Sequence, residues 1–397
     1  MKRLLVYSHD TYGLGNIRRM LTICEHLISA VRELSILLVT GSPVIHTLRL
    51  PESLDYIKIP CLTRVARGHY TTKYLNTHID DAIRLRSELI RTAVACFRPD
   101  LLVVDKKPLG VKGELAATLE YLRAERPGIR QVLVLRDILD SPEATTGNWE
   151  RNGHFDAVRR YYDRVLVLGE REVFDPLTEY HFPATVAEKA VFCGYIGKQA
   201  APHSREEMRS TLGIGADEKF VLVTPGGGQD GYEVIEKYLT GIRNAPPRHR
   251  CRSLIVCGPE MPGAQRTKLQ RQAAADTHIF YEFTGEMLGL MAAADVVVAM
   301  GGYNTVCEIL SLRKQAIIIP RVRPTEEQLI RADRMSRHGL FRMIHPDELT
   351  PERLMQQLTE SLEATDCGNV SYHPDLNALS VVAEHVRELL QDESRPA

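Results

Sequence analysis

The sequence is poor in aromatic residues, with one Trp among 397 residues, and none of its eight cysteines forms a CxxC pair. No run of about 18 uncharged apolar residues occurs, so no membrane-spanning helix is predicted. The apolar run after Met1-Lys2-Arg3 covers only Leu4–Tyr7, which is too short for a signal peptide. The cysteines therefore predict reduced, mostly buried thiols in a cytoplasmic protein, with neither a zinc site nor a dithiol redox site.

Charge of neither sign is in excess over the whole chain. There are 50 Lys and Arg against 51 Asp and Glu, which argues against a protein that coats nucleic acid. Residues 1–200 carry 28 basic and 24 acidic side chains, and residues 201–397 carry 22 and 27. The mildly basic first half either faces an anionic partner or reflects chance. With 44% hydrophobic and 25% charged residues, the composition is that of a globular protein of two or three domains.

Short β-branched apolar runs alternate with amphipathic stretches along the whole chain. Such runs are typical of strands buried on both faces of a parallel sheet. The alternation therefore predicts an α/β protein with two Rossmann-like, doubly wound sheets. We expect domains at residues 1–197 and 198–375, and a helix and tail at 376–397 that packs back on the first domain. The predicted strands are Leu4–Ser8, Ile36–Thr40, Leu101–Asp105, Val132–Arg136, Val165–Gly169, Phe220–Thr224, Ser253–Cys257, Ile279–Phe283, Val296–Met300 and Ala316–Pro320.

Ligands of open α/β sheets bind beyond the carboxyl ends of the strands, so we searched each strand end for functional residues. The strongest pattern is a glycine-rich loop between the strand at Phe220 and a helix at Tyr232, which contains Gly226, Gly227, Gly228 and Gln229. Glycines let the backbone approach a ligand closely, and amide groups at a helix start bind anions such as phosphate. The alternative is a glycine-rich turn without a ligand.

Two further strand ends in the second half carry polar residues. The first has Gly301, Gly302, Asn304, Thr305 and Glu308, where Asn304 or Thr305 is placed to cap a helix and Glu308 to accept hydrogen bonds from ribose hydroxyls. Glu308 could equally be a capping glutamate near the positive end of the helix dipole. The second has Glu327 and Gln328 at a helix start, where they are placed to bind a sugar or simply to cap the helix.

The first half offers candidates for proton transfer. His9 and Asp10 follow the first strand, and Asp105 ends the third. Imidazole titrates near neutrality and can act as a base, which a carboxylate can orient. A loop with Gly13, Gly15, Asn16 and Arg18 follows, in which Arg18 and Arg19 bind an anionic group or lie on a solvated helix face. The segment Leu62–Tyr74 has weak periodicity and is either a mobile acceptor loop or a basic surface loop.

The stretch from residue 280 to 332 resembles the nucleotide-sugar half of GT-B glycosyltransferases. The resemblance rests on Phe283-Thr284, on Gly301 to Glu308 and on Glu327-Gln328. The chain also resembles the N-acetylglucosaminyltransferases of peptidoglycan lipid-intermediate synthesis and bacterial proteins known only as predicted glycosyltransferases. The Gly226–Gly231 loop resembles the diphosphate loop of these enzymes, and Gly13–Arg19 stands where their first glycine loop stands. The similarity covers residues 220–335 well and residues 40–200 poorly.

The resemblance implies a role for each matching position. Gly226, Gly227 and Gly228 would approach the diphosphate of UDP, and Phe283 and Thr284 would lie beside the uracil. Asn304 and Thr305 would lie near the phosphates, Glu308 would hold the ribose hydroxyls, and Glu327 and Gln328 would bind the donor sugar. No metal or other cofactor is expected beyond the UDP-sugar co-substrate, because backbone amides and helix dipoles stabilise the leaving group in this class.

The resemblance predicts an inverting transferase that moves GlcNAc or another hexose from a UDP-sugar to an acceptor hydroxyl. Many relatives have His where this chain has Asn16, which counts against a hydrolase and does not identify the base. A resemblance to the His–Asp pairs of plant-type UDP-glycosyltransferases makes His9, with Asp10 or Asp105, the expected base. The alternatives are a UDP-sugar 2-epimerase or hydrolase and a nucleotide-sugar-binding protein without catalysis. The sequence does not identify the acceptor. A lipid-linked or cell-envelope glycan at the inner face of the cytoplasmic membrane is consistent with the family. Nucleic acid is not expected as a partner.

Overall fold

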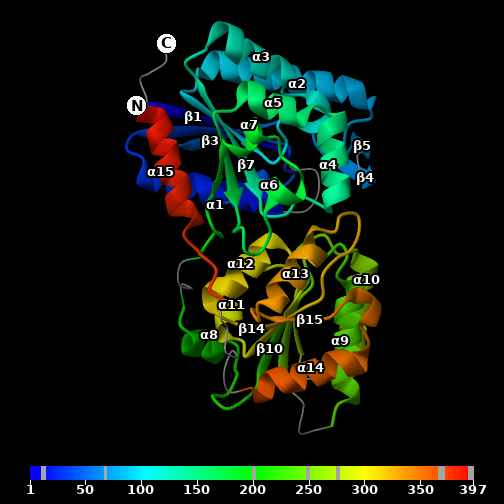
Figure 1. Ribbon diagram of the computed structural model, residues 1–397. Helices are drawn as coiled ribbons and strands as arrows, with labels where there is room; N and C mark the ends of the chain where they lie inside the picture. The colour runs from blue at the N-terminus through cyan, green and yellow to red at the C-terminus, as the bar shows by residue number, and fades with distance from the viewer. Residues whose placement is uncertain are drawn as a thin grey trace. The chain divides into compact units, whose positions relative to one another are not determined.

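A computed structural model describes residues 1–9, 15–66, 69–198, 203–246, 251–273, 278–364 and 372–391. The chain divides into two compact units (Figure 1). Unit 1 comprises residues 1–196 and 377–397, and unit 2 comprises residues 197–376. The chain therefore passes between the units twice, once after Ile196 and once after Leu376.

Unit 1 is built on a seven-stranded parallel sheet with the order β3-β2-β1-β6-β7-β8-β9. The core strands are apolar and almost fully buried; in β6 every residue is buried. Helices lie on both faces of the sheet (Figure 1). The strands are β1 Lys2–Ser8, β2 Leu34–Thr40, β3 Leu54–Lys58, β6 Leu101–Asp105, β7 Arg130–Arg136, β8 Arg164–Leu168 and β9 Ala190–Phe192. The helices are α1 Gly15–Ala30, α2 Ile79–Phe97, α3 Ala116–Glu125, α4 Pro142–Arg151, α5 His154–Tyr161, α6 Pro176–Glu179, α7 Ala184–Ala187 and α15 Ala378–Gln391.

The last helix, α15, belongs to unit 1 although it follows unit 2 in the sequence. It lies beside α1 (Figure 1), and its His385 contacts Arg164 at the start of β8. Its Val382, Val386 and Leu390 are buried. The helix therefore completes the core of the first unit.

Unit 2 repeats the same design with a six-stranded parallel sheet in the order β12-β11-β10-β13-β14-β15. The strands are β10 Phe220–Thr224, β11 Arg252–Val256, β12 His278–Tyr281, β13 Val296–Ala299, β14 Gln315–Ile318 and β15 Arg342–Met343. The helices are α8 Arg205–Thr211, α9 Tyr232–Asn244, α10 Gly263–Gln272, α11 Met287–Ala293, α12 Tyr303–Leu312, α13 Glu327–Arg337 and α14 Pro351–Glu363. The predicted pair of doubly wound parallel sheets is confirmed.

The strand order fixes where ligands bind in each sheet. In both units the chain builds outward from a central strand in one direction and then returns to its other side. The order therefore reverses between β1 and β6 in unit 1, and between β10 and β13 in unit 2. Ligands of open parallel sheets bind at this reversal, beyond the carboxyl ends of the strands. The segments that follow β1, β6, β10 and β13 are therefore the candidate ligand-binding segments of the two sheets.

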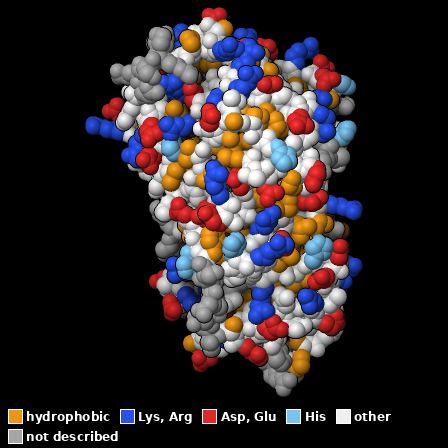
Figure 2. Space-filling model, viewed as in Figure 1, with side chains coloured by type: hydrophobic (Ala, Val, Ile, Leu, Met, Phe, Trp, Pro, Cys, Tyr) orange, Lys and Arg blue, Asp and Glu red, His pale blue; other side chains and the backbone are white. Residues whose placement is uncertain are grey.

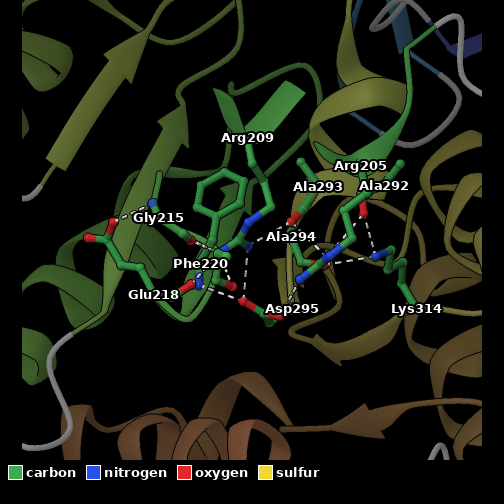
Figure 3. Close-up of polar contacts among 11 residues, drawn as sticks. Arg205, Arg209, Gly215, Glu218, Phe220, Ala292, Ala293, Ala294, Asp295 and Lys314 are labelled. Carbon is green, nitrogen blue, oxygen red and sulfur yellow. Dashed lines mark hydrogen bonds and ion pairs between the residues drawn. The ribbon is translucent and has the colours of Figure 1, made fainter. Parts of the chain in front are cut away.

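A polar cluster holds β10 against β13 at the amino ends of these strands (Figure 3). The glycine loops follow the carboxyl ends of the same strands. Asp295 accepts hydrogen bonds from Arg205 at 2.6 Å and from the Phe220 amide at 2.7 Å. Arg205 and Lys314 also donate to carbonyl groups at the end of α11, where a positive charge complements the helix dipole. This cluster holds the strands whose far ends carry the glycine loops.

The structure corrects the interpretation of Leu62–Tyr74 as a loop. The segment contains the antiparallel pair β4 Leu62–Ala66 and β5 His69–Thr72. Leu62 and Tyr70 of this hairpin pack with Ala82 of α2 and with Val111, so the hairpin is anchored on unit 1. Arg67 of the predicted basic loop lies outside the described residues.

Candidate functional site

The glycine-rich loop after β10 is shaped by close backbone contacts that only glycine permits. Gly226 and Gly228 have φ angles of 80° and 94°. A Cβ atom on Gly228 would lie 2.2 Å from the carbonyl oxygen of Cys257, in the loop after β11. The amide of Gly226 donates to the Thr224 hydroxyl at 3.3 Å. The glycines therefore let the loop pack closely against the loop after β11. They also carry no side chains that would keep an anion away from the backbone amides.

Glu260, which the sequence analysis did not single out, lies against this loop. Its amide donates to the carbonyl of Gly227 at 2.8 Å, and its carboxylate would be 2.9 Å from a Cβ on Gly227. A carboxylate accepts hydrogen bonds and so suits hydroxyl groups rather than phosphate. No pattern in the sequence marked this residue, because it stands in an irregular segment after β11.

The second glycine loop follows β13 and lies next to the first. The side-chain oxygen of Thr305 would be 4.0 Å from a Cβ on Gly226, which brings α12 to the loop after β10. The expectation that Asn304 or Thr305 caps this helix is wrong. The N-cap is Gly302, without a side-chain cap, and Asn304 and Thr305 lie in the first turn. Neither residue therefore acts as the N-cap of α12. Glu308 lies one turn further along and is half-buried.

The third polar segment, at the start of α13, is tied to both glycine loops. Gln328 accepts a hydrogen bond from the Arg321 amide at 3.1 Å, and its carbonyl oxygen would be 3.0 Å from a Cβ on Gly301. Glu327 accepts from Arg321 at 3.3 Å and from Thr325 at 2.8 Å. Glu327 and Gln328 are only 5% and 8% exposed. Either residue must therefore exchange an internal partner if it is to bind a ligand.

Two arginines that the sequence analysis missed connect these loops. Arg321 donates to Asp230 of the first loop at 3.3 Å as well as to Glu327. The fully buried Arg331 donates to the carbonyl of Gly301 at 2.8 Å and lies over the ring of Tyr303 at 5.6 Å. A buried guanidinium group of this kind holds a loop in place, because a buried carbonyl has few other hydrogen-bond donors within reach.

Phe283 and Thr284 follow β12 rather than belonging to a strand, since β12 ends at Tyr281. Phe283 is 50% exposed, which is unusual for a side chain so apolar. Thr284 accepts a hydrogen bond from the amide of Glu286 at 3.0 Å. The exposed ring at the carboxyl edge of the sheet offers a flat apolar surface to an aromatic ligand.

The reversal point of unit 1 brings together His9, Asn16, Arg19 and Asp105. Arg19 donates to Asp105 at 2.7 Å and to Asn16 at 3.2 Å. His9 Nδ1 is 3.8 Å from Asp105 Oδ2, and His9 Nε2 is 3.5 Å from Asn16 Nδ2. His9, Arg19 and Asp105 are all buried. Arg19, a candidate for anion binding in the sequence, instead holds Asp105 and Asn16 together at the centre of this cluster.

The other members of the predicted first loop differ in position. Gly15 is the exposed first residue of α1, and Arg18 is half-buried on the same helix. Asp10 and Gly13 lie outside the described residues. The structure therefore places His9, Asn16 and Asp105 in one cluster.

Electrostatics keep His9 neutral. Burial lowers its pKa well below the ordinary value of 6.5, and the positive charges of Lys107, Lys106, Arg19 and Arg136 lower it further. Asp105 does not reverse this effect, because its carboxylate is already paired with Arg19. A neutral imidazole at pH 7 can accept a proton, which is the property that a general base needs.

The described residues contain no cluster of side chains that could serve as a metal site. Among these residues, no three His, Cys, Asp or Glu side chains stand close enough together to hold a metal ion. The described residues also include no helix long and apolar enough to cross a membrane. On the face shown in Figure 2, acidic and basic side chains are interspersed, in keeping with the balanced charge.

Comparison with known proteins finds a match to a family model within the second unit. Residues 220–369 match the C-terminal domain of glycosyltransferase family 28. A UDP-N-acetylglucosamine–N-acetylmuramyl-(pentapeptide) pyrophosphoryl-undecaprenol N-acetylglucosamine transferase of Bacillus licheniformis is 26% identical over 206 residues. The match covers 51% of this chain and 53% of that enzyme, so the chain spans about half the length of the curated relatives it matches.

Solved structures of similar shape extend the likeness to both units. The glycosyltransferase of kitacinnamycin has a TM-score of 0.65 at 14% identity, covering 98% of this chain and 99% of that one. A putative UDP-N-acetylglucosamine 2-epimerase from Listeria monocytogenes has a TM-score of 0.64 at 11% identity, covering 100% and 99%. The fold is therefore GT-B. Within that class, the chain resembles the N-acetylglucosaminyltransferase named above, and residues 220–369 match the C-terminal domain of glycosyltransferase family 28.

Proposed function

We propose that the chain is a glycosyltransferase that moves GlcNAc or another hexose from a UDP-sugar to an acceptor hydroxyl, with inversion and without a metal ion. The observation that carries the proposal is the convergence of the loops after β10, β13 and β14 at the reversal point of unit 2. Gly226 adjoins Thr305, and Gly301 adjoins Gln328. The family 28 match over the same residues and the activity printed for the Bacillus enzyme support it.

The donor would occupy the carboxyl edge of the unit 2 sheet. Amides of Gly226, Gly227 and Gly228 would approach the diphosphate, together with the first turn of α12, which holds Asn304 and Thr305. Glu308 would accept hydrogen bonds from the ribose hydroxyls. The exposed Phe283 would cover the uracil, and Glu327 and Gln328 would contact the sugar.

The chemistry would use His9 as the base. The acceptor oxygen attacks the anomeric carbon, the bond from that carbon to the UDP oxygen breaks, and the hydroxyl proton moves to His9. The negative charge that develops on UDP faces the amides of the Gly226 loop and the positive end of α12. Preorganised amides of this kind stabilise a leaving group without reorganisation, which is why no metal is proposed.

The surface of unit 1 supports a lipid-linked acceptor. Five large apolar side chains of the β4–β5 hairpin region and α2 are exposed, namely Val65, Tyr74, Leu75, Leu85 and Leu89. Leu85 and Leu89 are four residues apart and therefore share one face of α2. Leu62 and Tyr70 of the hairpin pack with Ala82 in the first turns of this helix. We propose that this surface meets a membrane or the lipid of an acceptor, as the undecaprenol substrate of the Bacillus enzyme would require.

Nucleotide binding is the test of the donor site. Thermal unfolding would be followed with UDP, GDP, ADP and TDP, and with UDP-GlcNAc, UDP-glucose and UDP-galactose. A ligand at one hundred times its dissociation constant stabilises the fold by about 2.7 kcal/mol. We expect stabilisation by UDP and one UDP-sugar, lost in Glu308→Ala but kept in the exposed control Glu352→Ala. Binding by GDP or ADP alone would contradict the proposed donor.

A UDP-sugar 2-epimerase or hydrolase is the second candidate, because a structure described as a putative 2-epimerase matches the whole chain. Such an enzyme consumes UDP-sugar without an acceptor, whereas a transferase requires one. Asn16 stands where related UDP-sugar hydrolases have a histidine, which favours the transferase. Tight UDP binding without turnover on any acceptor would instead indicate a nucleotide-sugar-binding protein.

A further inference from the structure

Two buried polar atoms of unit 1 face each other without a hydrogen bond. His9 Nδ1 and Asp105 Oδ2 have no hydrogen-bond partner among the residues that the structure describes. They are 3.8 Å apart, beyond normal hydrogen-bond length, and their side chains are 5% and 0% exposed. Buried polar atoms rarely stay unpaired, so each is the natural partner of the other. A carboxylate only accepts, and the proton between them must therefore be on Nδ1.

The other nitrogen of His9 faces an amide whose orientation is fixed. Arg19 uses the same Nη2 to donate to Asp105 Oδ1 at 2.7 Å and to Asn16 Oδ1 at 3.2 Å. A guanidinium group can only donate, so the amide oxygen of Asn16 must point to Arg19 and its nitrogen away from it. That nitrogen, Nδ2, lies 3.5 Å from His9 Nε2. An amide NH₂ also only donates, and Nε2 must then carry the lone pair.

We infer that Asn16 and Arg19 are positioning residues that hold His9 as the tautomer with its proton on Nδ1 and its accepting lone pair on Nε2. The two sides of the ring give the same answer independently: a carboxylate acceptor faces Nδ1, and an amide donor faces Nε2. The inference deepens the proposed function, since it states which nitrogen of the proposed base takes the proton.

The arrangement explains how Asn16 serves where relatives have a histidine. At 3.5 Å the Asn16 contact is at the outer limit of a hydrogen bond, so an acceptor hydroxyl, also a donor, can replace the amide. The hydroxyl proton then passes to Nε2, and the imidazolium that forms keeps its Nδ1–H toward Asp105. Asn16 has no titratable group. Its role is to fix the orientation and tautomer of the His9 ring before the acceptor binds.

The experiment reads the tautomer of His9 directly. The whole chain would be labelled with ¹⁵N-histidine and the ring nitrogen shifts recorded at pH 8.5, with the His9 signals assigned from their loss in His9→Gln. We expect a protonated Nδ1 and an unprotonated Nε2. In Asn16→Asp, nearly isosteric but an acceptor, both ring nitrogens face a carboxylate, so the protonated fraction of Nε2 should rise. In Asn16→Leu, which has no hydrogen-bonding atom at this position, Asp105 alone holds the proton on Nδ1, so the rise should be smaller. The exposed control Asn152→Asp should match wild type.

The outcomes separate this inference from the proposed function. His9 with its proton on Nε2 in the wild type, or unchanged shifts in both Asn16 variants, would overturn the inference even if the protein transfers sugar. The expected shifts without transfer from any UDP-sugar would uphold the tautomer and contradict the proposed function. If transfer is observed, Asn16→Asp should lower kcat by about ten-fold or more with a smaller change in the acceptor KM.

Discussion

Asp105 Oδ1 accepts a hydrogen bond from Arg19 Nη2 at 2.7 Å at the centre of unit 1, where both side chains are buried. The pair lies beside His9, whose pKa falls well below 6.5 chiefly because the imidazole is buried. The positive charges of Lys107, Lys106, Arg19 and Arg136 lower this pKa further. The proposed base is therefore ready at neutral pH.

The first prediction concerns the pH dependence of sugar transfer. A base acts when unprotonated, so activity should stay constant as the pH falls through 6.5 and decline only near the lowered pKa of His9. Replacing Lys107 by Met removes the positive charge that has the largest lowering effect on the pKa of His9. The acid limb of kcat should then move to higher pH in Lys107→Met and stay in place in the control Lys2→Met. An acid limb of the wild type at or above pH 6.5 would contradict the assignment of His9.

The second prediction concerns stability and the buried His154. Burial, and then the charge of Lys107, lowers its pKa to about 4. Between pH 6.5 and 4 the unfolded chain binds a proton that the folded state does not, so stability falls as the pH drops through this window. One such group can cost about 3 kcal/mol at most by pH 4. His154 packs edge-on against Trp149 with ring centroids 5.6 Å apart.

His154→Phe should therefore preserve packing while removing part of the acid sensitivity. Urea denaturation at pH 7, 6, 5 and 4 would measure this as a flatter dependence of unfolding free energy on pH than in the wild type. The exposed His46→Asn is the matched control. Parallel curves for His154→Phe and wild type would show that another group causes the loss at low pH.

The third prediction concerns the polar cluster that holds β10 against β13 (Figure 3). Asp295→Asn removes the charge that pairs with Arg205 and Arg209 and leaves both arginines among backbone carbonyls. Since the carboxylate is 22% exposed, we expect a loss of about 1–3 kcal/mol in unfolding free energy. Asp347→Asn, with an 87% exposed carboxylate, should be neutral. UDP affinity of folded Asp295→Asn should stay within about three-fold of wild type, because the cluster is at the opposite edge of the sheet.

The sequence revealed the parts of the fold that depend on local pattern. Buried parallel strands such as β6 and β10 are continuous apolar runs, and glycines that follow such runs mark the strand ends where ligands bind. The β4–β5 hairpin was missed because its strands are short and its apolar residues are few. What holds the hairpin is packing on α2, a contact between distant segments.

The roles of the arginines in the two sites were missed for a related reason. Arg331 lies three residues after Gln328 and four before Met335, so its spacing indicates the buried face of α13, but an arginine in a helix is usually solvated. The sequence offered the same alternatives for Arg18 and Arg19, because it does not show that Arg19 is the one on the buried face of α1. Which buried cation meets which carbonyl or carboxylate depends on the tertiary structure, and the sequence pattern does not contain it.

The last prediction separates two glycines of the loop after β10 that look equivalent in the sequence. Gly228 has a φ of 94° and its Cβ would lie 2.2 Å from a backbone oxygen, whereas the Cβ of Gly227 would meet only the flexible Glu260 carboxylate, at 2.9 Å. Gly228→Ala should therefore cost about 2–4 kcal/mol of stability and abolish UDP binding. Gly227→Ala should fold normally but bind UDP more weakly, because a methyl group intrudes where the diphosphate approaches the backbone. Gly263→Ala, with nothing within 4 Å, is the control. Thermal unfolding with and without UDP measures both effects, and normal UDP binding by Gly228→Ala would show that the diphosphate lies elsewhere.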